Sequence, residues 1–226
     1  MLTRELAARY ANPIVAVEVD PDLSRALTDA LGDRAEVRTE DAVRVELPAG
    51  PFRAVGNLPY NVGTPILRRV IAAPQCRRAV FMLQKEVADR ITAVPGDEAY
   101  GYLTLYVELF AHARTLMTLE PGSFHPRPKV RSAVVVFDPA ATEVQSSHEL
   151  LLELISQAFR MRRKTLANNL EGFRGLPRAE AAAAIAEAGL PAGVRAEEMS
   201  LVAFDGLATT MDARLAASPA RKPLRS

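Results

Sequence analysis

The chain has 226 residues and a formal net charge of +1, with 49% hydrophobic and 24% charged residues. This is the composition of an ordinary globular protein, long enough for one moderate domain with a smaller one beside it. The near-neutral charge excludes a global basic field, so any nucleic-acid partner must be held by a local cluster of cations.

The content of cysteine and histidine excludes some site classes. Cys76 is the only cysteine and the three histidines are scattered, so we expect no disulfide and no metal. No apolar run approaches the ~20 residues of a membrane span, and the N-terminal residues lack the apolar stretch of a signal peptide. We expect a cytoplasmic monomer with no membrane partner.

The first 139 residues alternate short apolar strands with amphipathic helices. Strands are predicted at 14–19, 35–38, 53–56, 79–83, 115–119 and 132–137, and helices at 22–31, 65–72 and 85–92. Residues 102–110 fit either a helix or a strand. Continuous apolar strands between helices are typical of a mainly parallel, doubly wound α/β sheet, in which ligands bind beyond the carboxyl ends of the strands.

The character of the chain changes after Pro139. Residues 140–148 are small and polar and suit a linker. Helices without strands are predicted at 149–170, 178–188 and 200–216, with Ser200 as a candidate cap. We therefore expect an α/β domain at 1–139, the linker, a small all-α domain at 149–217, and a disordered basic tail at 218–226.

Two acids follow the first two predicted strands. Glu18 ends a buried strand before a helix, which is where a doubly wound fold binds a ribose through its two hydroxyl groups. Asp41, with Ala42 beside it, follows the next strand and is placed to accept a hydrogen bond from the exocyclic amine of an adenine. The alternatives are a solvated acid for Glu18 and a turn or cap residue for Asp41.

The loop from Gly56 to Asn61, with the sequence GNLPYN, follows the third predicted strand. The Asn57 side-chain oxygen and a backbone carbonyl at Leu58 or Pro59 suit acceptance of two hydrogen bonds from one amino group. Pro59 stiffens the loop, and Tyr60 suits stacking on a base. Catalysis by such a loop rests on positioning, and the alternative is a simple proline turn.

Cations gather at two further places. Phe124 precedes a stiff loop with Arg127 and Lys129, which suits a stacked base with phosphates nearby, although a Phe can also anchor such a loop to the core. Four cations, Arg160, Arg162, Arg163 and Lys164, fall in five positions of one predicted helix. A solvated helix face usually mixes charge signs, so we favour an RNA phosphate contact there, with Asn168 and Asn169 on the same surface.

Several segments, in order, resemble the ribosomal RNA adenine N6-dimethyltransferase family: AVEVD, EDA, VGNLPYNVGTPIL, QKEVADR, SFHPRPKVRSAV and AFRMRRKTLANNL. The resemblance implies a Rossmann-like methyltransferase domain, a helical C-terminal domain, S-adenosylmethionine as cofactor, and dimethylation of adenines in small-subunit (16S) rRNA during ribosome biogenesis. It implies that Glu18, Asp41 and Asn57 bind the cofactor and that Tyr60 and Phe124 sandwich a flipped base.

The sequence departs from the family pattern at its start. Family members carry E-x-G-x-G-x-G before the L-T-x-x-L segment, which is Leu2–Leu6 here, so the first strand and its glycine loop are absent. The resemblance places that strand between those at Ile14 and Arg53. We therefore expect weak or no binding of S-adenosylmethionine by this polypeptide alone. A shortened reading frame of an active enzyme is the explanation we favour over a remnant.

Three other functions remain open. A resistance-type methyltransferase of large-subunit rRNA shares the same loops, although the basic segment at 160–164 and the full helical domain favour the small subunit. A non-enzymatic rRNA-binding or assembly factor fits the missing glycine loop but not the intact NLPY sequence. DNA adenine methylation is disfavoured because no dedicated recognition domain is present.

Overall fold

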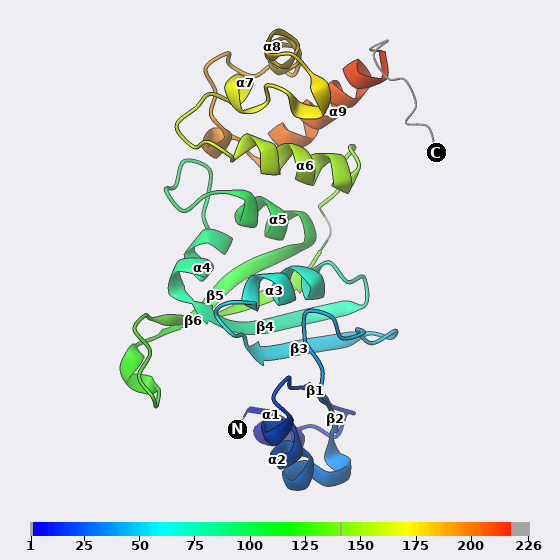
Figure 1. Ribbon diagram of the computed structural model, residues 1–226, viewed down its shortest axis with the longest axis vertical. Helices are drawn as coiled ribbons and strands as arrows, with labels where there is room; N and C mark the ends of the chain where they lie inside the picture. The colour runs from blue at the N-terminus through cyan, green and yellow to red at the C-terminus, as the bar shows by residue number, and fades with distance from the viewer. Residues whose placement is uncertain (1, 141, 218–226) are drawn as a thin grey trace. The chain divides into compact units, whose positions relative to one another are not determined.

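The computed structural model describes residues 2–140 and 142–217 (Figure 1). The predicted basic tail at 218–226 lies outside the described residues. The strands are β1 (Val15–Val17), β2 (Glu36–Arg38), β3 (Phe52–Asn57), β4 (Cys76–Gln84), β5 (Ala111–Leu119) and β6 (Ser132–Pro139). The α-helices are α1 (Leu2–Arg9), α2 (Pro21–Leu31), α3 (Gly63–Ile71), α4 (Lys85–Ile91), α5 (Tyr102–Phe110), α6 (His148–Ala158), α7 (Leu166–Asn169), α8 (Arg178–Glu187) and α9 (Leu201–Ala217).

The described residues form two compact units. The first contains residues 2–84 and Leu116–Pro139, and the second contains Lys85–Thr115 and the described residues from 140 onward. The second unit therefore includes α4 and α5, which the sequence places in the α/β part of the chain. The domain boundary predicted at 139/140 stays a prediction. Within the described residues, every helix falls short of the length and apolarity that a membrane span requires.

Local signals set the bounds of α2. The Asp20 side chain accepts hydrogen bonds from the backbone N–H groups of Asp22 and Leu23 at 2.8 and 3.2 Å. Pro21 occupies the first helical position, and Gly32 ends the helix with a φ of 53°, which is readily adopted by glycine. The predicted helix at 22–31 is confirmed. It connects β1 to β2, which pair in parallel with Val17 opposite Arg38.

The remaining strands form a four-stranded mixed sheet in the order β3-β4-β6-β5. β3 and β4 are parallel, and β6 runs antiparallel to β4. The sequence predicted a mainly parallel sheet that lacks a strand between those at Ile14 and Arg53, and the described strands lie in two sheets. The physical reason is pairing: β1 pairs with β2, β3 pairs with β4, and no described strand lies between β1 and β3. The strand-helix-strand alternation itself is confirmed.

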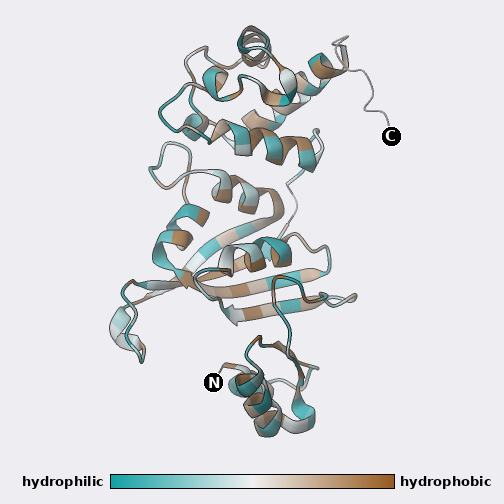
Figure 2. Cartoon of the chain, viewed as in Figure 1, coloured by the Kyte–Doolittle hydropathy of each residue, from teal (hydrophilic) through white to brown (hydrophobic). Residues whose placement is uncertain are grey.

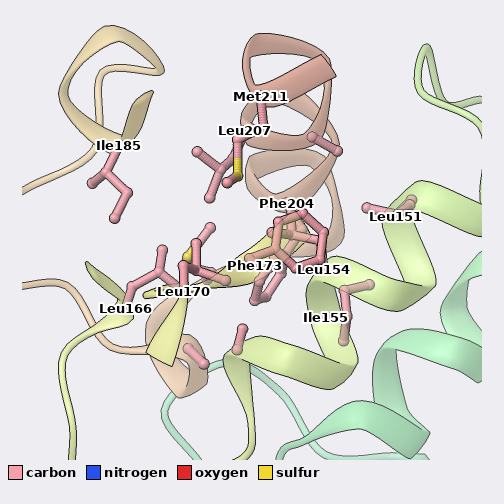
Figure 3. Packing of buried hydrophobic residues seen from close by; sticks show 14 of the residues in the cluster. Leu151, Leu154, Ile155, Leu166, Leu170, Phe173, Ile185, Phe204, Leu207 and Met211 are labelled. Carbon is pink, nitrogen blue, oxygen red and sulfur yellow. The ribbon is translucent and has the colours of Figure 1, made fainter. Parts of the chain in front are cut away.

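A helical core organises the second unit. Residues 102–110, ambiguous in sequence, form the helix α5. Figure 3 shows side chains of α6, α7, α8 and α9 packed together. The labelled residues, all buried, are Leu151, Leu154, Ile155, Leu166, Leu170, Phe173, Ile185, Phe204, Leu207 and Met211. Helix α6 carries hydrophobic and hydrophilic residues together, as expected for an amphipathic helix (Figure 2).

The cations at 160–164 do not lie on a helix, so that expectation is wrong. Helix α6 ends at Ala158, and Phe159 leaves the helical region with a φ of −93° and a ψ of 8°. Helix α7 restarts only at Leu166. At the break, the Asn169 side chain bonds the backbone N–H and carbonyl of Met161, which take the place of helical backbone partners. The four cations therefore lie on a loop.

A buried carboxylate ties the segment after residue 140 to α9. Asp205, 9% exposed, accepts hydrogen bonds from the backbone N–H groups of Gln145 and Ser146 at 2.9 Å each and from the Ser146 hydroxyl. Burial raises the pKa of this carboxyl, but the three hydrogen bonds outweigh burial and hold its pKa below the usual value. The predicted linker is thus fixed in place at Gln145 and Ser146.

Asp205→Asn is expected to lower the free energy of unfolding by ~1–3 kcal/mol at pH 7, because an amide NH₂ then faces backbone donors. The lowered folded-state pKa means that the carboxylate stabilises the fold above the unfolded value of ~3.9. That contribution is lost as the pH falls through the folded pKa. Urea unfolding at pH 7 and pH 3 should show a large gap between wild type and variant that narrows in acid. A gap of equal size at both pH values would contradict this role.

Candidate functional site

Glu18 and Asp41 lie at the same edge of the two-stranded sheet. Glu18 directly follows β1, and its backbone N–H donates to the Arg38 carbonyl at the end of β2 at 3.0 Å. Its Oε1 accepts the Asp20 N–H at 3.0 Å. Asp41 is exposed, and its Oδ1 accepts the Val43 N–H at 2.8 Å. Each carboxylate therefore uses one oxygen to shape its own loop and lies where two parallel strands end.

The NLPY loop, residues 57–60, begins at the last residue of β3 and is held in place at Leu58. Asn57 ends the strand with its side chain exposed, whereas Leu58 is 7% exposed and donates its N–H to the Met82 carbonyl at 3.2 Å. The Pro59 carbonyl accepts the Val62 N–H at 3.3 Å, which closes a turn. The loop thus displays Asn57 at the carboxyl end of a parallel strand, where the sequence placed it.

The start of α3 packs directly against this loop. A Cβ atom added at Gly63 would lie 3.2 Å from Leu58 Cβ, which is tighter than ordinary contact, and Gly63 is buried. A Cβ atom added at Gly56 would lie 3.3 Å from the Leu58 side chain. These two glycines let the backbone close around Leu58, and a tightly packed anchor of this kind limits the positions open to Asn57.

Tyr60 is half exposed, at 51%, and its hydroxyl lies 3.4 Å from the hydroxyl of Ser132. Ser132 is 1% exposed and begins β6, opposite Gln84 at the end of β4. The sequence did not single out Ser132, and no local signal identifies it, because 72 residues separate it from Tyr60. Its contact brings the NLPY loop and the start of β6 together and leaves the tyrosine ring available to solvent.

Phe124 follows the 3₁₀ turn η2 (Pro121–Ser123) in the loop that leads into β6. The side chain is half buried, and no ring-ring contact joins it to Tyr60 among the described residues. Arg127 and Lys129 further along are exposed. At the base of the loop, Arg131 lies 4.0 Å from Glu120. The structure thus places the two cations on an exposed loop, while the sandwich of Tyr60 and Phe124 stays a prediction.

Comparison with known proteins decides the family. The sequence model of the ribosomal RNA adenine dimethylase family matches residues 1–203. The chain belongs to this family. The resemblance read from the sequence motifs is thereby confirmed, and the chain is an rRNA adenine dimethyltransferase by membership.

Curated relatives support the same assignment. The ribosomal RNA small subunit methyltransferase A of Maricaulis maris is 42% identical over 218 residues, which cover 92% of this chain and 75% of that protein. The protein of the same name from Acidobacterium capsulatum is 37% identical, with 93% and 77% coverage.

Two solved structures share the fold. A dimethyladenosine transferase from Plasmodium falciparum superposes with a TM-score of 0.78 at 22% identity, covering 94% of this chain and 86% of that one. The 23S rRNA methyltransferase ErmE superposes with a TM-score of 0.68 at 26% identity and the same coverage. The expected Rossmann-like methyltransferase fold with a helical part is confirmed.

The basic loop of this dimethylase, residues 160–164, has four exposed cations, two of which make hydrogen bonds within the protein. Arg160 donates to Gln157 Oε1 at 3.3 Å, and Arg162 donates to the Glu98 carbonyl. The side chains of Arg163 and Lys164 are exposed. Beneath the loop lies a groove of about 350 Å³, lined by Gln157, Arg160, Met161, Asn168, Asn169 and Glu171.

The two asparagines differ from expectation in what they contact. Asn169 is 2% exposed and its amide bonds the Met161 backbone, so it does not lie on the outer surface. Asn168 accepts a hydrogen bond from Arg178 at 2.7 Å. The sequence reasoning assigned both side chains to an RNA-facing surface, which is wrong for Asn169 because its polar atoms are used inside the fold.

Proposed function

We propose that this chain transfers methyl groups from S-adenosylmethionine to the N6 atoms of adenines in small-subunit rRNA during ribosome assembly, in the cytoplasm. The observation that carries the proposal is the NLPY loop, which presents Asn57 at the carboxyl end of β3 on a backbone anchored by Leu58. Family membership and small-subunit relatives at 37–42% identity support the substrate class.

The acid pair fits the nucleoside part of the cofactor. Glu18 and Asp41 lie at one edge of adjacent parallel strands, which is where doubly wound folds bind nucleosides. We assign the ribose hydroxyls to Glu18 and the adenine of the cofactor to Asp41, with Ala42 beside it. When bound, the cofactor supplies an electrophilic methyl group on a sulfonium.

The NLPY loop holds the target amino group. The lone pair of adenine N6 is delocalised into the ring, which makes the nitrogen a poor nucleophile. Asn57 Oδ1 and a backbone carbonyl accept its two hydrogens, which favours a pyramidal nitrogen with its lone pair toward the methyl donor. The Pro59 carbonyl already accepts the Val62 N–H, so we assign the second acceptor to Leu58.

The remaining residues hold the RNA. Tyr60 stacks on the extruded base, with Phe124 on the other face, since a base must leave its stack to be modified. The exposed cations Arg127, Lys129, Arg163 and Lys164, with Arg160 and Arg162, contact phosphates. Residues of the α/β part thus act at the reacting centre, and the cations of the basic loops supply the affinity for RNA.

A substrate-choice assay tests this function. The protein is incubated with a large excess of labelled S-adenosylmethionine, because weak cofactor binding is expected, and with either immature small subunits or large subunits that lack adenine methylation. The rRNA is then digested to nucleosides. We expect N6,N6-dimethyladenosine from the small subunit alone. Label in large-subunit rRNA would instead support the resistance-type activity, and rRNA binding without any label would support a non-enzymatic assembly factor.

A further inference from the structure

The loop from Arg160 to Lys164 joins α6 to α7. It carries four cations and no acid, and its cationic groups therefore repel one another. A loop of this charge, left to itself, samples many conformations, and each costs entropy when it is fixed on a nucleic acid. Something in the fold must hold the loop if it is to bind RNA without that cost.

The buried Asn169 side chain holds it. Its Oδ1 accepts the Met161 N–H at 3.1 Å, and its Nδ2 donates to the Met161 carbonyl at 3.0 Å. The backbone N–H and the backbone carbonyl of Met161 are thus both bonded by the side chain of Asn169, eight residues further along the chain. The same Met161 carbonyl also accepts the Lys164 N–H at 3.0 Å, which closes the turn that bears the cations.

The two hydrogen bonds between the Asn169 side chain and the Met161 backbone are called the Asn169 clip below. Asn169 itself is held in place by the helical core. Gln157, near the end of α6, donates its Nε2 to the Asn169 carbonyl at 2.7 Å. Asn169 is 2% exposed and lies on the short helix α7, beside the buried Leu166 and Leu170. The clip therefore joins the basic loop to the helical core, and it is the amide's paired donor and acceptor that make it possible.

We propose that Asn169 is a positioning residue for RNA binding: it fixes the turn at Met161 so that the cations of residues 160–164 meet the phosphates in a preformed arrangement. The proposal rests on the proposed function, because it takes the basic loop to contact rRNA. Asn169 touches no RNA itself. Its contribution is to lower the entropy that the loop loses on binding and to keep the cations opposite the phosphates. Its removal therefore weakens binding and loses about one phosphate contact without removing a charge.

The test measures binding of the full chain to small-subunit rRNA at several salt concentrations. Asn169→Leu keeps the size of the buried side chain and removes both hydrogen bonds. We expect its Kd to rise about tenfold and its salt dependence to fall by about one phosphate contact, a change of roughly 0.7–0.9 in log–log slope. The matched control is Thr209→Val on α9, which keeps the size of the side chain and removes a hydrogen bond to the Asp205 carbonyl and not to the loop, and it should keep the wild-type Kd.

A double-mutant cycle separates positioning from a general structural role. The variant Arg163→Gln/Lys164→Gln removes the exposed cations directly. If Asn169 acts through them, Asn169→Leu raises the Kd much less in that background than in the wild type. An equal rise in both backgrounds would overturn the proposal, as would a wild-type Kd for Asn169→Leu when the charge variant binds weakly. A charge variant that binds like wild type would instead overturn the proposed RNA contact itself.

A second variant tests the proposal in case Asn169→Leu does not fold. Should thermal unfolding show that Asn169→Leu does not fold, Gln157→Met takes its place, because it removes the bond to the Asn169 carbonyl, together with the 3.3 Å bond that Arg160 donates to the same side chain. We then expect a smaller rise in Kd with the same direction of change in the salt slope. A folded Gln157→Met variant with wild-type Kd and wild-type slope would count against the clip.

Discussion

Asn57→Ala lowers the turnover number of methyl transfer by about 10²–10³-fold, the loss expected when one preorganised hydrogen-bonding group of a catalytic site is removed. The affinity for rRNA stays within about twofold, because the phosphate contacts lie elsewhere. The physical reason is that Asn57 acts on the amino group at the reacting centre, where its acceptor makes the nitrogen a better nucleophile. Single-turnover methylation of immature small subunits, with binding measured separately, checks both quantities.

The matched control for this variant is Asn61→Ala. Asn61 is an exposed asparagine in the same loop, four residues along, and carries no assigned role. Its replacement should leave turnover near the wild-type value. Comparable losses in the two variants would show that the loop is merely fragile, and full turnover in Asn57→Ala would remove Asn57 from the chemistry.

Tyr60→Ala is expected to weaken productive binding of the target adenine by about 1–3 kcal/mol, the usual worth of one stacked base, which is roughly 5- to 150-fold in kcat/KM. The half-exposed ring is available for stacking, whereas its hydroxyl lies beside the buried Ser132. Tyr60→Phe keeps the ring and loses only that weak contact, so it should retain most of the activity.

The pair of Tyr60 variants distinguishes stacking from hydrogen bonding. A large loss in Tyr60→Phe, matched by Ser132→Ala, would mean that the hydroxyl contact, and not the ring face, is what positions the base. Retained kcat/KM in Tyr60→Ala would exclude stacking on this residue. Both variants are assayed on small-subunit rRNA with the same wild-type reference.

Features with local physical causes could be predicted from the sequence. The start and end of α2 follow from Asp20, Pro21 and Gly32, which act within one helical turn. The positions of Glu18, Asp41 and Asn57 at or just after strand ends follow from the predicted strand bounds, which the structure reproduces closely. The carboxyl ends of parallel strands lie at the same edge of a sheet. The pattern of strands and helices therefore also predicts that Glu18 and Asp41 lie at one edge.

Features that depend on distant contacts could not be predicted. The sequence predicted one helix over 149–170, whereas α6 ends at Ala158 and the Asn169 side chain bonds the Met161 backbone beyond that end. The Tyr60–Ser132 contact depends on how β4 and β6 pair, which periodicity does not determine.

The position of an adenine on the NLPY loop tests the account most directly. A crystal structure of the protein with a short RNA that presents an unpaired adenine should place N6 about 2.7–3.2 Å from both Asn57 Oδ1 and the Leu58 carbonyl oxygen, with the base against the Tyr60 ring. An adenine bound with its amino group turned away from Asn57, or bound outside this loop, would contradict it.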